Sequence, residues 1–196
     1  MSEIIKSPDS DNLLEETFCE LGISGEHKNL AISLLKPLKE SDQIHQECYQ
    51  HCLRVGILAK QIGAVMHLDE RSLFYAGLFH DIGKQTMDSN LLGKTDTWTQ
   101  DDKDEAKKHV LTGYYLVKDK FDFSAEILLF HHYFQPDPYP SEIPSFLHPY
   151  SNGTKATIMN YARIISLADT YDALHRKNSY FNKNTSLTDQ EIEDQM

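Results

Sequence analysis

An adjacent histidine and aspartate, His80-Asp81, stand in the segment AGLFHDIGK at residues 76–84. Each side chain can offer a ligand atom to a metal ion, and the two oxygens of the Asp81 carboxylate could bridge two ions. Neutral histidine is the commonest side-chain metal ligand, and carboxylates suit manganese, magnesium and ferrous iron. The pair therefore predicts a metal site.

Further residues of ligand type lie on both sides of this pair, each in a stretch whose pattern predicts a helix. Residues three or four apart share one face of a helix, whereas adjacent residues diverge by about 100°. The predicted metal ligands are Glu47, His51, His80, Asp81, His109, His131, His132, Asp169 and Asp172. This set suffices for two divalent ions, and for three if Glu47 and Asp172 both face the cluster.

A single histidine on a helix is most often a structural residue, which suits the unassigned His27, His45, His67, His148 and His175. That explanation fails for the larger set, because burying so many ionisable groups without a metal is costly. Cys48 and Cys52 flank His51 and could suggest a thiolate site, but core-facing residues on one helix explain them better. With three cysteines and no CxxC, no disulfide framework is expected.

The composition limits the classes of partner. The 196 residues carry a formal net charge of −11, so general nucleic-acid binding, which depends on neutralising phosphates, is not expected. The longest apolar run, about residues 73–79, is far too short to span a membrane. Residues 1–10 are polar and acidic, so no signal peptide is expected, and a cytoplasmic location is predicted. The oligomeric state stays open.

Apolar residues recur at helical spacing through most of the chain, and no strand alternation is seen. The fold class predicted is all-α, with an N-terminal helical extension at 1–40 that packs on a main domain at 41–196. Helices are predicted at about 12–21, 27–38, 41–63, 70–79, 102–117, 125–133 and 156–175. His109 falls in the middle of the fifth of these and His131-His132 within the sixth. Residues 135–152 hold five prolines and are predicted to be loop.

The order of these motifs resembles the HD-domain metal-dependent phosphohydrolases, and among them the HD-GYP branch, whose members hydrolyse cyclic di-GMP. The resemblance covers about residues 45–185. It rests on HCLRV from His51, on residues 76–84, on HVLTG from His109, on His131-His132 and on ARIISLADTYDAL at 162–174. It implies an HD-domain-like helical bundle with a metal site in the bundle core.

The resemblance also implies a role for each matching residue. One ion would be held by His51, His80, Asp81 and Asp169. The second would be held by the bridging Asp81 with His109, His131 and His132. Glu47 and Asp172 match acidic positions that support a third ion in trinuclear members, and Lys84 matches the lysine that meets the substrate phosphate.

Two departures from the HD-GYP pattern affect the expected substrate grip. The family usually has His-His-Glu and then a Gly-Tyr-Pro loop, whereas this chain has HHY and then PYP around Tyr139. After the DAL segment the family usually carries Arg-Pro-Tyr and a base, where this chain has NSYF at 178–181. The predicted substrate-binding residues are Lys84, Tyr139, Arg176 and Lys177. Cyclic di-GMP is a candidate substrate, with slow turnover or none expected.

A pair of divalent ions can clamp a phosphate oxygen and generate hydroxide at neutral pH. In such a mechanism Asp81 and Lys84 are the predicted catalytic residues, since Asp81 would fix the metal spacing and Lys84 would offset developing charge. Mixed histidine and carboxylate ligands favour iron or manganese over zinc, magnesium or nickel.

The function predicted is a metal-dependent phosphohydrolase or phosphodiesterase acting on a small-molecule nucleotide or cyclic dinucleotide. A non-catalytic HD-domain signalling or binding module is one alternative, because the loop is altered; such a module need not hold two ions. A di-iron oxygenase is another, and Lys84 and the C-terminal motif argue against it.

Overall fold

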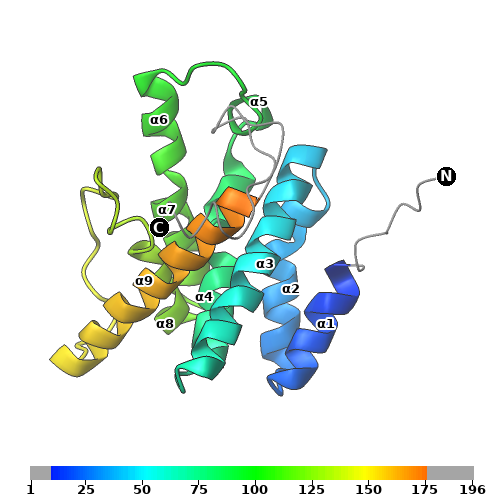
Figure 1. Cartoon of the computed structure of the whole chain (residues 1–196), viewed down its shortest axis with the longest axis vertical. Coiled ribbons are helices and arrows are strands. Elements are labelled where there is room, and N and C mark those ends of the chain that lie inside the picture. The colour runs from blue at the N-terminus through cyan, green and yellow to red at the C-terminus, as the bar shows by residue number, and fades with distance from the viewer. Residues whose placement is uncertain (1–9, 176–196) are drawn as a thin grey trace.

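The structure is a computed structural model, and residues 10–175 are described. Those residues are helical with no strand, which confirms the all-α prediction (Figure 1). The helices are α1 (Ser10–Glu20), α2 (Gly25–Lys39), α3 (Gln43–Val65), α4 (Glu70–Phe79), the 3-10 helix η1 (Ile82–Thr86), α5 (Ser89–Leu92), α6 (Gln100–Lys107), α7 (His109–Val117), α8 (Asp122–Leu129) and α9 (Asn152–His175). None of the helices within 10–175 has the length and hydropathy of a membrane span.

The packed pair α3 and α4 lies at the centre of the bundle. The Asp69 side chain starts α4 by accepting hydrogen bonds from the N–H groups of Arg71 and Ser72. The two helix backbones approach closely at Gly56 and Gly77, where a Cβ on Gly77 would lie 2.8 Å from the Gly56 Cα. This close contact fixes the distance between His51 on α3 and the end of α4.

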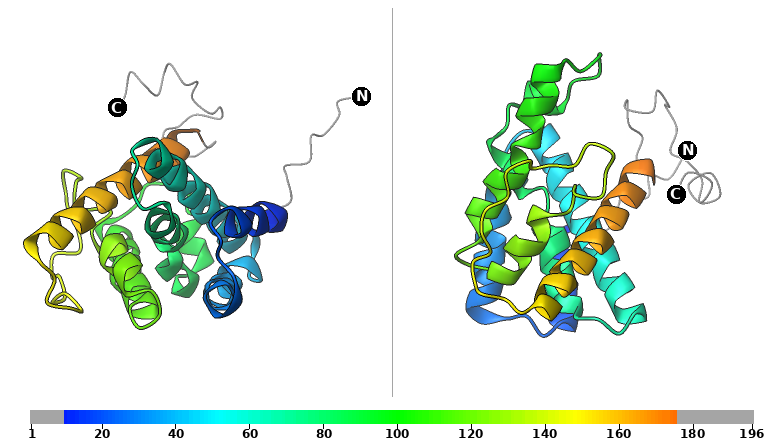
Figure 2. Two further views of the ribbon diagram at one scale, coloured as in Figure 1. Left: turned by 90° about the horizontal axis from the view of Figure 1, so that it is seen from below. Right: turned by 90° about the vertical axis from the view of Figure 1, so that its left-hand side faces the viewer.

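The remaining helices pack around this pair. Helix α9 runs diagonally across α4 and α8 in Figure 1 and also contacts α3. Helices α1 and α2 flank the bundle on the side away from α8, as Figure 2 shows. The α1 side chain Phe18 meets Phe74 of α4 edge-on, with ring centroids 5.9 Å apart, so α1 shares the core of the bundle. The division of the chain at residue 40 stays a prediction.

Two predicted helices differ from the structure. The predicted helix 102–117 is two helices, since the Lys108 N–H bonds to the Glu105 carbonyl three residues back and tightens the turn. His109 therefore begins α7. Helix α8 ends at Leu129, and the N–H groups of Phe130 and His131 again bond three residues back. His131 and His132 thus lie in a turn, where the helical rule for adjacent residues does not apply.

The η1 segment passes unusually close to α7 at Gly83. A Cβ at this position would lie 1.9 Å from the His109 carbonyl oxygen and 2.7 Å from the Gly113 nitrogen. Both atoms are backbone, so neither can move aside without shifting a helix. This contact holds the segment that bears Asp81 and Lys84 against the helix that bears His109.

We expect Gly83→Ala to lower the free energy of unfolding by about 1–3 kcal/mol, because the added methyl overpacks this contact. Urea denaturation of the metal-free protein measures the effect. Gly153→Ala is the matched control, because its Cβ would meet nothing nearer than 3.7 Å. Gly153 lies in α9, so alanine should leave the free energy of unfolding unchanged or raise it by up to about 1 kcal/mol. Equal denaturation midpoints for the two variants would contradict the close approach.

Candidate metal centre

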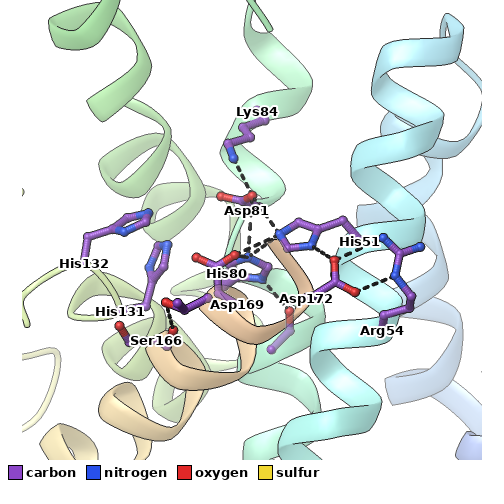
Figure 3. Close-up of polar contacts among 12 residues, drawn as sticks. His51, Arg54, His80, Asp81, Lys84, His131, His132, Ser166, Asp169 and Asp172 are labelled. Atoms are coloured by element: carbon purple, nitrogen blue, oxygen red, sulfur yellow. Dashed lines mark hydrogen bonds and ion pairs between the residues drawn. The ribbon is translucent and has the colours of Figure 1, made fainter. Parts of the chain in front are cut away.

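Ligand atoms from four segments converge in the bundle core. They form two groups in which all atoms lie within 4.8 Å of one another, and every member is buried. One group comprises His51, His80 and Asp81, and the other comprises Asp81, His109, His131 and His132. Asp81 belongs to both groups. Figure 3 shows this carboxylate between His51 on one side and His131 and His132 on the other.

Backbone carbonyls orient three of the imidazoles. The Nδ1 atom of His80 lies 2.7 Å from the carbonyl oxygen of Gly77. The Nδ1 atom of His109 lies 2.6 Å from the Ala106 carbonyl oxygen, and that of His131 lies 2.5 Å from the Leu128 carbonyl oxygen. A carbonyl only accepts, so each Nδ1 must carry the proton. The Nε2 lone pair of each ring is then available to a metal, as in metal sites whose second ring nitrogen is held.

The inward-facing atoms lack the partners that buried polar atoms normally have. Among the described residues, His131 Nε2 is buried without a hydrogen-bond partner. Asp81 Oδ1 and His109 Nε2 are also buried, and they face each other at 3.1 Å as two acceptors when Nδ1 of His109 carries the proton. The Nε2 atoms of His51 and His80 face each other at 3.2 Å. Unsatisfied buried groups of this kind are rare and costly. The donor set therefore fits divalent metal ions.

The charge states of His131 and Asp81 suit metal binding, whereas an ion must displace a proton from His51. Burial lowers the pKa of His51, but the Asp169, Asp172 and Asp81 carboxylates raise that pKa to about 10, and metal binding releases such a proton. Burial, followed by the neighbouring His80 and His109, lowers the pKa of His131 to about 3, so its ring is neutral at pH 7. Burial alone would raise the pKa of Asp81, but Lys84 and His80 hold that pKa well below its usual range. Neutral imidazole and ionised carboxylate are the forms that bind metals.

Asp169 lies beside the first group. Its Oδ1 is 3.1 Å from His51 Nε2 and 3.7 Å from His80 Nε2, and its side chain is 19% exposed. The structure thus brings Asp169 to the ligand atoms of His51 and His80, on the side that opens to solvent.

Asp172 lies behind the ring of His51 in this structure. Its Oδ2 accepts from Nδ1 of His51 at 2.7 Å, on the far side of that ring from Nε2. The Arg54 guanidinium donates to both carboxylate oxygens, at 2.6 and 3.1 Å. One helical turn beyond Asp169, the Asp172 carboxylate meets Nδ1 of His51, whereas Asp169 meets Nε2. Asp172 therefore orients His51, and Arg54 orients Asp172.

Sequence reasoning missed Arg54 as a functional residue. The available signal was its position three residues after His51, which places both on one face of α3. Glu47, one turn before His51, is exposed and accepts a hydrogen bond from Gln43. Glu47 also lines the pocket that His51 and Arg54 border. Its part in a third ion stays a prediction.

The predicted substrate-binding residues lie on different sides of the centre. Lys84 Nζ donates to Asp81 Oδ2 at 2.5 Å and borders a pocket of about 780 Å³. Tyr139 instead stacks on His132, with ring centroids 4.4 Å apart and planes inclined by 25°, and so covers the second group. Arg176 and Lys177 lie outside the described residues.

Residues 48–174 match the family model described as HD domain. The chain belongs to the HD domain family. Over 37 residues it is 54% identical to a Mycoplasma genitalium protein named as a probable nicotinate-nucleotide adenylyltransferase/Ap4A hydrolase, covering 19% of this chain and 11% of that protein. Over 70 residues it is 39% identical to ribonuclease Y of Lactobacillus gasseri, covering 36% of this chain and 13% of that protein. The chain thus matches only a short part of these relatives.

We expect Asp81→Ala to lower metal content more than any other single ligand change, since Asp81 belongs to both groups. His51→Ala and His132→Ala should each release about one ion per chain, and Asp81→Ala should release both. Elemental analysis after loading with manganese measures this result. Asp119→Ala, at an exposed site, is the control. Full metal content in folded Asp81→Ala would refute the shared role.

We expect Asp172→Asn and Arg54→Met each to weaken binding of the ion held by His51 by about 10–100-fold, the usual effect of losing an outer-shell partner. Because Arg54 acts through Asp172, the double variant should be little worse than Asp172→Asn. Competition with a chelator measures the affinity. Arg163→Met, whose guanidinium stacks on Phe134 at 4.8 Å, is the control. Fully additive effects would show that Arg54 does not act through the carboxylate.

Proposed function

We propose that this chain is a metal-dependent phosphohydrolase that cleaves a phosphoester of a small nucleotide. The observation that carries the proposal is the shared carboxylate of Asp81, which belongs to both ligand groups and contacts Lys84 at the edge of a pocket. A centre that only stabilised the fold would need neither a second group nor a cation beside an open space.

Bound divalent ions would supply a hydroxide nucleophile and positive charge for a phosphate. The chain's own residues supply the rest. Asp81 holds the two groups at a fixed separation, and Lys84 places an ammonium where a phosphate oxygen can reach it. Burial disfavours the ammonium, but the Asp81 carboxylate raises the pKa of Lys84, so the side chain stays cationic at neutral pH. Fixed positive charge of this kind stabilises the developing negative charge in the transition state.

A small nucleotide suits the pocket better than a polymer does. Its volume of about 780 Å³ lies within the range of small-molecule sites, and Lys84, Arg54 and Lys94 line it in a chain of net charge −11. The relative named for Ap4A hydrolysis supports a nucleotide phosphoester as the target. The HD-GYP resemblance supports a cyclic dinucleotide, with cyclic di-GMP the first to be tested.

Iron or manganese is the proposed metal, because the donor set combines five imidazoles with the carboxylates of Asp81 and Asp169. We propose a cytoplasmic location, because Cys19, Cys48 and Cys52 are free thiols, as is usual in reducing compartments.

The complete ligand set argues against a non-catalytic binding module. Lys84 beside Asp81 argues against a di-iron oxygenase, whose chemistry has no need of a phosphate-binding cation.

The testing experiment is turnover of a panel by the manganese- or ferrous-loaded protein under anaerobic conditions. The panel comprises bis(p-nitrophenyl) phosphate, Ap4A, linear dinucleotides and cyclic di-GMP. We expect Lys84→Met to lower kcat/KM on whichever ester is cleaved by about 100-fold, with metal content retained, as removal of one charge-stabilising donor does elsewhere. Lys103→Met, at an exposed site, is the control.

Absence of turnover across the panel with both metals would overturn the proposed function. Oxygen uptake by the ferrous-loaded protein in a separate aerobic assay, without hydrolysis in the panel, would favour the oxygenase. Cyclic di-GMP is expected to be turned over slowly or not at all, since positions 178 and 181 lack the family's cations.

A further inference from the structure

The pocket beside the metal centre extends well beyond the ligand atoms. Its inner end is formed by His51, Asp81 and Lys84. Its outer end is formed by the first turn of α3, with Gln43 and Ile44, and by residues 92–95 after α5. A phosphoester bound at the metal centre would fill only the inner end, so the outer end is available to another part of the substrate.

We propose that the outer end is a subsite for a nucleobase, which makes the substrate a nucleotide whose phosphate lies at the metal centre. The inference rests on the proposed function and adds the part of the substrate that decides specificity.

Apolar side chains give this end the character of a stacking site. Ile44 and Leu92 both line the pocket and are half-buried. A Cβ at Gly93 would lie 3.2 Å from the Ile44 Cδ1. Because glycine has no side chain, Ile44 can pack closely against the backbone that follows α5. The flat face of a base can cover such a surface, because burying apolar area is favourable whichever base is present.

Carboxamides beside this surface can read the edge of a base. Gln43 donates to Glu47 Oε1 at 2.9 Å, and Gln46 donates to the Ser41 carbonyl at 2.8 Å. Each bond uses one N–H and fixes the amide plane. The amide retains a second N–H and a carbonyl oxygen for a ligand. A paired donor and acceptor of this kind match the adenine edge at N6 and N7.

The length of the pocket matches a nucleotide. Eight residues separate Gln43 from His51 along α3, which is about 12 Å at 1.5 Å per residue. Between them the wall is polar, formed by Glu47, Gln50 and Arg54 at helical spacing. A sugar can cross this polar stretch and join a phosphate at the inner end to a base at the outer end.

Equilibrium binding tests the subsite without turnover. The probes are the phosphonate analogues of AMP and of ribose 5-phosphate, whose P–C bonds are not hydrolysed, titrated calorimetrically into the manganese-loaded protein. If the base occupies the outer end, the adenosine analogue should bind at least about tenfold more tightly than its base-free counterpart.

Three variants locate the binding. Gln43→Leu should reduce the adenosine preference about three- to tenfold, and Leu92→Trp, which fills the outer end, should abolish it. Gln61→Leu is the matched control, because Gln61 is an exposed glutamine on the same helix outside the pocket. It should leave the preference unchanged.

Equal affinity for the two analogues would overturn the subsite, and so would a preference that survives both Gln43→Leu and Leu92→Trp. Neither result bears on phosphoester hydrolysis itself, which the turnover panel tests separately. A protein that cleaves bis(p-nitrophenyl) phosphate but shows no base preference would keep the hydrolase and lose the subsite.

Discussion

The burial of several ionisable groups in one place is the constraint on which the rest of this structure depends. The exposed fraction is no more than 3% for the Asp81 carboxylate and for four imidazoles, those of His51, His80, His109 and His131. The atoms that point into the centre have few hydrogen-bond partners. Such an arrangement is unfavourable by itself, because unpaired polar atoms lose their hydration. It becomes favourable once cations occupy the space. The helices therefore form a frame that holds these groups together against their own desolvation.

The ends of helices are what hold the histidines in place. Gly77, Ala106 and Leu128, whose carbonyls contact histidine Nδ1 atoms, lie in the last turns of α4, α6 and α8. Carbonyls in a last turn have no donor four residues ahead within the helix. Each of these three carbonyls instead accepts a hydrogen bond from the side chain of the histidine three residues later in the sequence. Ending a helix thus also fixes the protonated nitrogen of a ligand ring and the direction of the other nitrogen.

This role of helix ends explains what the sequence could and could not predict. The predicted ligand set could be recognised because His80-Asp81, His109 and His131-His132 are all residues that bind metals. They also follow one another in the order typical of the HD-domain family. Their backbone was predicted wrongly for His109 and His131, since helical periodicity continues through Lys108 and Phe130 while the chain turns there. Periodicity reports which residues are apolar, but it does not show the backbone bonds to the carbonyl three residues back with which α6 and α8 end. The contacts of Asp172 could not be predicted for a related reason. Spacing puts it on the face of Asp169, but only the position of Arg54 shows which side of His51 the carboxylate meets.

The two ligand groups differ in their access to solvent, and this asymmetry sets the direction from which a substrate can approach. Over the second group, Tyr139 stacks on His132, and the Lys107 ammonium lies 5.5 Å from the tyrosine ring centroid. The first group borders the pocket through His51 and Asp81. Lys84, bonded to the carboxylate shared by both groups, stands on the pocket side. A phosphate arriving there meets the shared ligand and the cation together, while the rest of the molecule is left against α3. In the proposed function, the chemistry of α3 between Gln43 and Arg54 would therefore decide which substrate is accepted.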